Sequence, residues 1–243
     1  MSDSKIVVDG VSKGFGALSV VGGVSFDVRE GEFVAIVGPS GCGKSTLLNI
    51  IAGFERPDQG QVRINGVVRT GPSRNGIMIS QHGSVFPWLT VHENLMFGLS
   101  GTSHGDKRGR ADRYIEMVGL AGFEAAYPHE LSGGMLKRVE IARALVVKPE
   151  ILYMDEPFSA LDALMSLRMQ TELRRILDEE RHTVLLITHD VEEAIFLADR
   201  ILVLSPRPTV IQTTFDVDLP HPRKLSDPRA QALREAILKE LGL

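Results

Sequence analysis

Residues 38–46 read GPSGCGKST, and this stretch decides the fold that we predict for the whole chain. The stretch fits the pattern G-x-x-x-x-G-K-[ST]. Its four fixed positions are occupied by Gly38, Gly43, Lys44 and Ser45. The apolar run 33–37 before it predicts a buried strand, and the run 46–52 after it predicts the start of a helix. A strand, a glycine-rich loop and a helix in this order predict a phosphate-binding site, because N–H groups of the loop and of the helix start point toward the ligand.

The alternative is a glycine-rich turn that carries a surface lysine, and the flanking strand and helix disfavour it. All nine residues of the loop are therefore predicted to contact a nucleotide: Gly38, Pro39, Ser40, Gly41, Cys42, Gly43, Lys44, Ser45 and Thr46. We expect Lys44 to bridge the terminal phosphates and the Ser45 hydroxyl to hold Mg²⁺. Cys42 is the only cysteine, so we expect it to fill space rather than to take part in redox chemistry.

Length and composition limit the remaining possibilities. The chain has 243 residues, which suits one large domain over 1–243 or a domain with an inserted subdomain. Its net charge of -4 does not indicate a nucleic-acid partner. No apolar run approaches the roughly 18 residues of a membrane span, and the polar start of the sequence does not resemble a signal peptide. We therefore expect any work at a membrane to pass through a partner.

The first seventy residues predict an antiparallel β layer around the strand at 33–37. Alternating apolar residues near 6–8 and 24–28 indicate strands, and 61–68 carries the hairpin turn Asn65-Gly66. Phe15 lies in this layer, where it is either a platform for base stacking or an ordinary core aromatic. Spacing alone leaves these two interpretations of Phe15 equally open.

Residues 84–147 change from strand to helix periodicity, which predicts an inserted helical subdomain. Thr90 and Glu93 form a capping-box pattern, so a helix is expected to begin there. The polar, glycine-rich stretch 100–110 is expected to be a loop, followed by a short helix over 110–118. The residues from 206 to 243 are expected to form a short tail with one last helix.

A second anion-binding site is suggested by Ser132, Gly133 and Gly134, which open the long helix predicted over 135–147. Free N–H groups, little steric bulk and the helix dipole all favour an anion there. A simple N-cap explains the same residues equally well.

Two further strands are predicted over 151–154 and 183–187, and each ends in polar residues. Asp155 and Glu156 follow the first strand, and His189 follows the second. Because ligands of α/β sheets bind at the carboxyl ends of the strands, we expect Asp155 to take Mg²⁺ and Glu156 to orient or deprotonate the attacking water. The alternatives are surface acids at a strand end and a structural histidine.

These signals occur in one order along the chain: GPSGCGKST, Gln81, LSGGM, ILYMDEP, SALD and THD. In this the sequence resembles the nucleotide-binding subunit of the ATP-binding cassette transporters over essentially its whole length. The resemblance implies an α/β fold with a P-loop NTPase core, mostly parallel, plus an antiparallel β layer and an inserted helical subdomain. It also implies ATP and Mg²⁺ as cofactors.

Roles are carried over to matching positions of this sequence. Phe15 resembles the aromatic that stacks on adenine, and Gln81 the glutamine that contacts Mg²⁺ and the transmembrane partner. Ser132, Gly133 and Gly134 resemble the signature that caps the γ-phosphate of ATP on the other subunit. The remaining matches are Asp155 with Walker B, Glu156 with the catalytic base, Asp162 with the D-loop aspartate and His189 with the switch histidine.

Two residues depart from the family pattern. The signature ends in Met135 rather than glutamine, and Phe15 stands where tyrosine is more usual. We expect activity to survive both changes, because the phosphate contacts come from Ser132 and the glycines and because stacking needs only a ring face.

The stretches FPWLTVHENLMFGL and ITHDVEEAIFLADRILVLSPRP are similar to those of the nitrate, sulfonate and taurine importers. This similarity implies permease partners, an extracytoplasmic solute-binding protein and a location at the cytoplasmic face of the inner membrane. Both halves of the ATP site are intact in this sequence, so we expect a homodimer of ATPase subunits. Phe86, Pro87 and Trp88 would line the groove for the permease, although Trp88 is alternatively a core aromatic. The remaining alternatives are an importer of another small solute, such as a thiamine precursor, and a soluble ATPase in cofactor assembly. A small-molecule kinase is disfavoured by LSGG.

Overall fold

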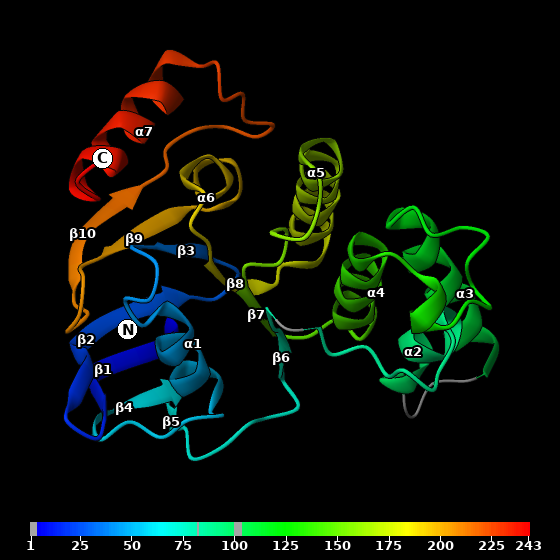
Figure 1. Cartoon of the computed structure of the whole chain (residues 1–243), viewed down its shortest axis with the longest axis horizontal. Helices are drawn as coiled ribbons and strands as arrows, with labels where there is room; N and C mark the ends of the chain where they lie inside the picture. The colour runs from blue at the N-terminus through cyan, green and yellow to red at the C-terminus, as the bar shows by residue number, and fades with distance from the viewer. Residues whose placement is uncertain (1–3, 82, 100–103) are drawn as a thin grey trace.

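The computed structural model describes residues 4–81, 83–99 and 104–243, and it contains two sheets and a set of helices (Figure 1). The strands are β1 Ser4–Phe15, β2 Leu18–Arg29, β3 Phe33–Val37, β4 Gln59–Ile64, β5 Val67–Val68, β6 Gly76–Ile79, β7 Ile151–Asp155, β8 Thr183–Ile187, β9 Arg200–Leu204 and β10 Ile211–Asp216. The helices are α1 Lys44–Ala52, α2 Val91–Phe97, α3 His104–Met117, the short 3₁₀ helix η1 Pro128–Glu130, α4 Gly133–Val146, α5 Ala163–Glu180, α6 Val191–Leu197 and α7 Pro228–Glu240.

The larger sheet has the order β10-β9-β3-β8-β7-β6, and its strands are parallel except for the antiparallel pair β9–β10. β3 lies inside this sheet and is buried along its whole length. The strands that precede Ser80, Glu156 and Thr188 run parallel to β3, so their carboxyl ends share one edge with the loop at 38–46. The predicted α/β fold with a mostly parallel sheet is confirmed.

The smaller sheet is antiparallel, in the order β2-β1-β4-β5, and it confirms the predicted β layer. Successive side chains of β3 point to opposite faces, as the strand period requires. Val34 and Ile36 join a core with α1 and the antiparallel layer, whereas Phe33, Ala35 and Val37 join the core formed with the other helices. The helix after the phosphate loop is therefore held between the two sheets.

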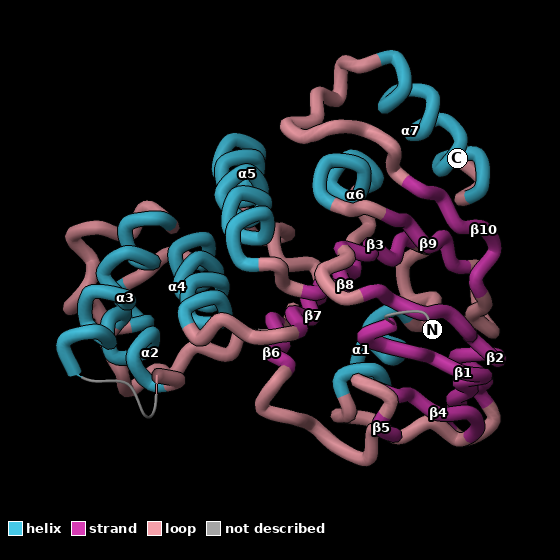
Figure 2. Tube along the Cα trace, turned by 180° about the vertical axis from the view of Figure 1, so that it is seen from behind, coloured by secondary structure: helices cyan, strands magenta, loops and turns pink. Residues whose placement is uncertain are grey.

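The helices α2, α3 and α4 pack together on the far side of β6 from α1 (Figures 1 and 2). The capping box at Thr90 is present, with both of its hydrogen bonds. The loop expected over 100–110 is wrong from His104 onward, because α3 already begins there. Residues 100–103 lie outside the described residues. The extent of the helical subdomain, 84–147, remains a prediction.

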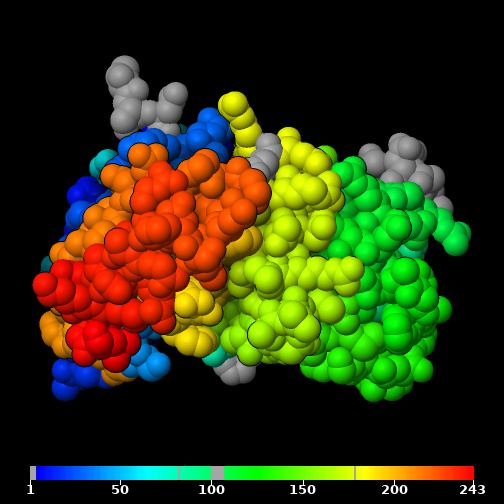
Figure 3. Space-filling model, turned by 90° about the horizontal axis from the view of Figure 1, so that it is seen from above, coloured from blue at the N-terminus to red at the C-terminus, as the bar shows by residue number. Residues whose placement is uncertain are grey.

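The C-terminal segment is more than a tail with one helix. β10 pairs with β9 at the edge of the large sheet, and α7 packs on α6. Figure 3 shows this segment, in orange and red, at the end of the molecule opposite the green helices. The boundary at residue 206 remains a prediction. The turn between β9 and β10 contacts the phosphate loop.

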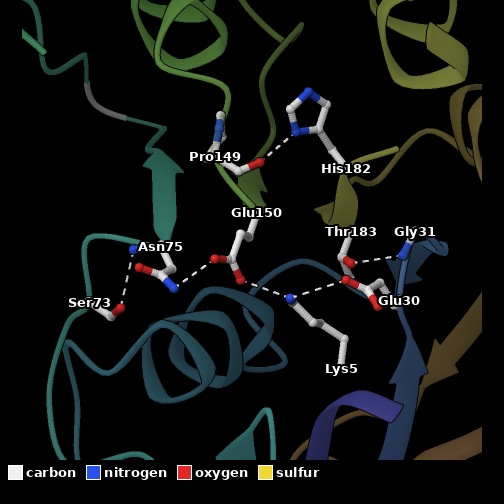
Figure 4. A network of polar contacts seen from close by, with 9 residues as sticks. All are labelled: Lys5, Glu30, Gly31, Ser73, Asn75, Pro149, Glu150, His182 and Thr183. Atoms are coloured by element: carbon white, nitrogen blue, oxygen red, sulfur yellow. Dashed lines mark hydrogen bonds and ion pairs between the residues drawn. The ribbon is translucent and has the colours of Figure 1, made fainter. Parts of the chain in front are cut away.

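A polar network closes the opposite edge of the sheet, where β7 and β8 begin (Figure 4). Lys5 Nζ lies 2.8 Å from Glu150 Oε2 and 3.5 Å from Glu30 Oε1. The Asn75 amide donates to the other oxygen of Glu150, at 2.8 Å. These contacts connect β1 of the antiparallel sheet to the start of β7 in the larger sheet. They fix the two sheets relative to each other at the edge far from the phosphate loop.

In the described part of the chain, every helix is too short or too polar to pass through a bilayer.

Candidate functional site

A cavity of about 660 Å³ lies beside the loop at 38–46. Its lining comes from both sheets, the loop, and the turn between β9 and β10. The lining residues are Phe15, Leu18, Val20, Ser40, Gly41, Gly43, Lys44, Ser45, Thr46, Gln81, Glu156, His189 and Arg207. Residues that were predicted from separate stretches of sequence thus meet at a single cavity.

The loop itself is built for close approach to a ligand. Gly41 and Gly43 have φ angles of 70° and 124°, a region that favours glycine. A Cβ at Gly43 would lie 2.7 Å from a methyl carbon of Val20, so no other residue fits there without movement. Helix α1 begins at Lys44 with no side-chain cap, which leaves its first N–H groups available to an anion.

Lys44 holds its ammonium group inside the loop, where the residue is only 6% exposed. Its Nζ donates to the carbonyl oxygens of Gly38, at 2.8 Å, and Pro39, at 3.0 Å. Cys42 is buried in the same loop, and its carbonyl accepts a hydrogen bond from the Thr209 hydroxyl. The ammonium of Lys44 is therefore held by two carbonyl groups at the start of the loop.

Asp155 and Ser45 meet beside this cation. Burial raises the pKa of Asp155, and a hydrogen bond from the Ser45 hydroxyl opposes this shift. A buried carboxylate next to a hydroxyl is a donor set for a hard cation such as Mg²⁺, which prefers oxygen ligands.

Glu156 follows Asp155 and is held between two polar side chains. Its Oε2 accepts a hydrogen bond from the Gln81 amide at 3.3 Å. Its Oε1 lies 3.3 Å from His189 Nδ1. The side chains of three strand ends thus converge at one carboxylate on the edge of the cavity.

The Ser132 region lies elsewhere in the chain. The Ser132 hydroxyl caps α4 by accepting from the Met135 N–H at 3.3 Å, so the N-cap interpretation holds within one chain. Ser132, Gly133 and Gly134 are not among the lining residues of the cavity. Asp162 caps α5 in the same way, accepting from the Met165 N–H at 3.0 Å.

Two aromatics singled out in the sequence are exposed. Phe15 is 50% exposed, borders the cavity and has Lys13 Nζ 5.3 Å from its ring centroid. Trp88 is 69% exposed, and its ring lies 5.5 Å from that of Phe86. Phe86 also stacks with Arg143, whose guanidinium carbon is 4.8 Å from the ring centroid. Neither Phe15 nor Trp88 is a core residue.

Sequence reasoning missed Arg207 and Thr209, which bring the β9–β10 turn to the phosphate loop. Arg207 donates through Nε to the carbonyl of Gly41. These contacts join positions separated by 166 and 167 residues, and no local pattern in the sequence indicates them.

Comparisons with known proteins agree with this geometry. The model of the ABC transporter family matches residues 21–159. The aliphatic sulfonates import ATP-binding protein SsuB of Bacillus licheniformis is 45% identical over 228 residues, which span 94% of this chain and 89% of that protein. The dimeric structure of MJ0796, a bacterial ABC transporter cassette, superposes with a TM-score of 0.80 at 31% identity, covering 88% of this chain and all of that one. A post-hydrolysis dimer of MJ0796 bound to ADP and Pi has a TM-score of 0.78, with the same identity and coverage.

Proposed function

This chain belongs to the ABC transporter family as an ATP-hydrolysing subunit, and from that premise we propose that it energises an importer of a small anionic solute of the sulfonate class. The observation that carries the hydrolytic role is the placement of Glu156 between Gln81 and His189, beside the loop that contains Lys44; the importer and its solute class rest on the similarity to the sulfonate import subunit. Such a carboxylate can act on a water molecule that attacks the terminal phosphate.

The nucleotide occupies the cavity with its phosphates on the loop at 38–46. The loop N–H groups and the start of α1 bind the phosphate oxygens, and Lys44 neutralises the terminal phosphates. Phe15 stacks on the adenine, which its exposed ring face permits.

Mg²⁺ fits the oxygen atoms of Ser45 and Asp155, with Gln81 nearby. When bound, it would offset the negative charge that develops on the phosphates. The chain itself supplies the orientation: Asp155 is fixed by the end of β7, and Ser45 by the first turn of α1.

Glu156 accepts the proton of the attacking water. Gln81 and His189 each contact one of its oxygens, so the carboxylate keeps one orientation toward the cavity. In this proposal His189 also contacts the γ-phosphate. The position of His189 and Glu156 therefore depends on whether ATP or ADP is bound.

A second copy of the chain completes the site. Ser132, Gly133 and Gly134 of that copy cap the γ-phosphate, with Asp162 next to the shared interface. The exposed hydroxyl of Ser132 and the dimeric MJ0796 structures support this arrangement. Each ATP then joins two subunits, and its hydrolysis releases them.

The family assigns membrane permease subunits as partners, and hence a peripheral place at the membrane. We propose that the permease contacts the exposed ring of Trp88 and the half-buried ring of Phe86 together with Pro87, on the cytoplasmic face. An extracytoplasmic solute-binding protein would deliver the solute to the permease. Exposed clustered aromatic side chains are typical anchors of protein interfaces.

Substitution of Glu156 by glutamine tests the proposal. We expect Glu156→Gln to lower ATP turnover by at least about 100-fold, because the proton acceptor is lost. ATP affinity should remain, and a dimer stable in ATP should appear by size-exclusion chromatography. The matched control is Glu235→Gln on the exposed face of α7, which should hydrolyse ATP at the wild-type rate.

Uptake measurements identify the solute. Cells that carry the wild-type chain should accumulate a labelled alkanesulfonate, and cells that carry Glu156→Gln should not. Uptake of nitrate, taurine or a thiamine precursor instead would assign another solute. Normal turnover by Glu156→Gln would overturn the role of Glu156. Uptake of every one of these solutes at the same rate in wild-type and variant cells would favour a soluble ATPase of cofactor assembly.

A further inference from the structure

The turn between β9 and β10, residues 205–210, is fixed against the phosphate loop. Its Thr209 is fully buried and exchanges backbone hydrogen bonds with β2, donating to Val20 O and accepting from Gly22 N, both at 2.9 Å. The Thr209 hydroxyl donates to the carbonyl of Cys42. A turn held by three such bonds presents its other side chains in a defined position.

Arg207 extends from this turn over the loop. Its Nε–H donates to Gly41 O, and its Nη2 would lie 3.2 Å from a Cβ placed on Gly41. The guanidinium therefore lies against the backbone of the loop, at the border of the same cavity as Lys44. No partner for its Nη groups is found among the residues that the structure describes, so these N–H donors remain available to a ligand.

Arg207 adds a second cationic side chain to the lining of the cavity. Among the described lining residues, the other lysine or arginine is Lys44, which lies inside the loop, whereas Arg207 lies on its outer border. Two such side chains around one cavity suit a polyanionic ligand.

We propose that Arg207 is a nucleotide-binding residue, whose guanidinium contacts the phosphate chain of ATP or ADP from the β9–β10 turn. A guanidinium is suited to this contact because its planar, permanently charged fork matches two phosphate oxygens. The bond from Nε–H to Gly41 O sets the orientation of the fork. This inference rests on nucleotide binding by the cavity and adds a ligand that comes from outside the loop and the strand ends.

Binding of ATP and ADP, measured by calorimetry at low and high salt, tests the contact. We expect Arg207→Gln to weaken both nucleotides about tenfold at low salt, because a charge-assisted hydrogen bond is lost. The deficit should shrink at high salt, and Arg207→Lys should fall between the wild type and Arg207→Gln. The matched control is Arg229→Gln, which removes the same charge from a surface ion pair with Asp227 on α7.

Three results would count against this inference. Equal ATP affinity of Arg207→Gln and the wild type would overturn it. The two variants Arg207→Gln and Arg207→Lys could also lose the same ATP affinity at both salt concentrations and unfold at a lower temperature without nucleotide. This result would mean that Arg207 only holds the backbone of Gly41 in place and does not contact the phosphates. If the wild type and Arg229→Gln also failed to bind ATP, the proposed function itself would fall.

Discussion

At the scale of single residues, the proposed chemistry coincides with a strained backbone. Glu156 has a φ of 48°, which is uncommon for a residue with a side chain. Its N–H donates to Ile187 O at 2.9 Å, which continues the pairing of β7 with β8 past the end of the strand. The turn is therefore held by the sheet, and it directs the carboxylate between Gln81 and His189. Backbone strain of this kind is concentrated at functional sites.

Glu193 is a second unusual carboxyl group near this edge. It is 7% exposed, and its Oε2 accepts a hydrogen bond of 2.5 Å from the hydroxyl of Thr188, next to His189. Burial raises the pKa of Glu193 to about 7, although the Thr188 bond opposes the shift; the negative charges of Asp190 and Glu156 raise it further. Glu193 thus links the end of β8 to helix α6.

We expect Glu193 to make stability depend on pH. Between its ordinary pKa near 4.5 and the folded value of about 7, the folded chain holds a proton that the unfolded chain has lost. The free energy of unfolding therefore falls as pH rises through this window, by up to about 3 kcal/mol. Glu193→Gln cannot ionise, so its unfolding free energy, measured by urea denaturation from pH 5 to 8, should fall less steeply.

The control for this prediction is Glu192→Gln, one residue earlier on α6. Glu192 is partly exposed and pairs with Arg234 at 2.9 Å, so its loss should cost no more than about 1 kcal/mol. Its curve against pH should run parallel to that of the wild type. A parallel curve for Glu193→Gln as well would show that Glu193 does not titrate in this range.

The sequence distinguishes the residues of the phosphate loop but not Glu192 from Glu193. Loop residues are recognised because their spacing is fixed by contact with one ligand. Of two adjacent glutamates at the start of a helix, only one faces the core. A seven-residue helix is too short for the spacing of its apolar residues to show which glutamate that is. Arg207 escapes prediction because its contact joins distant parts of the chain.

At the scale of elements, tertiary packing stabilises a helix where the local composition predicted a loop. The start of α3 contains Gly105 and Gly109, each of which costs about 1 kcal/mol in a helix relative to alanine. Further along, Ala111 and Ile115 are buried in the core shared with α2 and α4, so tertiary contacts support the helix. β10 is equally hard to predict, because its residues alternate only between half-buried and exposed at a sheet edge.

The end of α1 gives a prediction at this scale, because the backbone of Gly71, in the segment after β5, lies directly against the residue that ends the helix. Gly53 caps α1 with a φ of 88°, and a Cβ there would lie 2.4 Å from Gly71 O. We expect Gly53→Ala to lower the free energy of unfolding by more than about 2 kcal/mol, since backbone strain and a steric clash add. Thermal or urea denaturation measures the loss.

The turn of the predicted hairpin supplies the comparison. Gly66 has a φ of 77°, but a Cβ added there would meet nothing within 4 Å, so Gly66→Ala should cost only the strain of about 1 kcal/mol. Equal losses in the two variants would mean that Gly71 moves away from Gly53 at no cost.

At the scale of the whole molecule, the function proposed above requires that one chain provide only part of the site. The cavity is lined by the loop, both sheets and the β9–β10 turn, whereas α4 lies across β6 and β7 from α1 (Figures 1 and 2). Ser132 and its glycines are exposed or half-buried at the start of α4. If they bind the nucleotide, they bind that of another copy, and each chain then contributes to two sites.

Mixing two inactive variants tests this division between copies. Lys44→Ala damages the loop and Ser132→Arg blocks the start of α4, so each variant alone should lose nearly all ATP turnover. A mixed dimer contains one site with an intact loop and an intact Ser132, from different chains. An equal mixture should therefore regain about a quarter of wild-type turnover, since half of randomly paired dimers are mixed and each has one working site.

The control is a mixture of Lys44→Ala with Glu156→Gln, which should regain no turnover, because Lys44 and Glu156 act in the same chain's site. Recovery in neither mixture, with mixed dimers present, would refute the shared site.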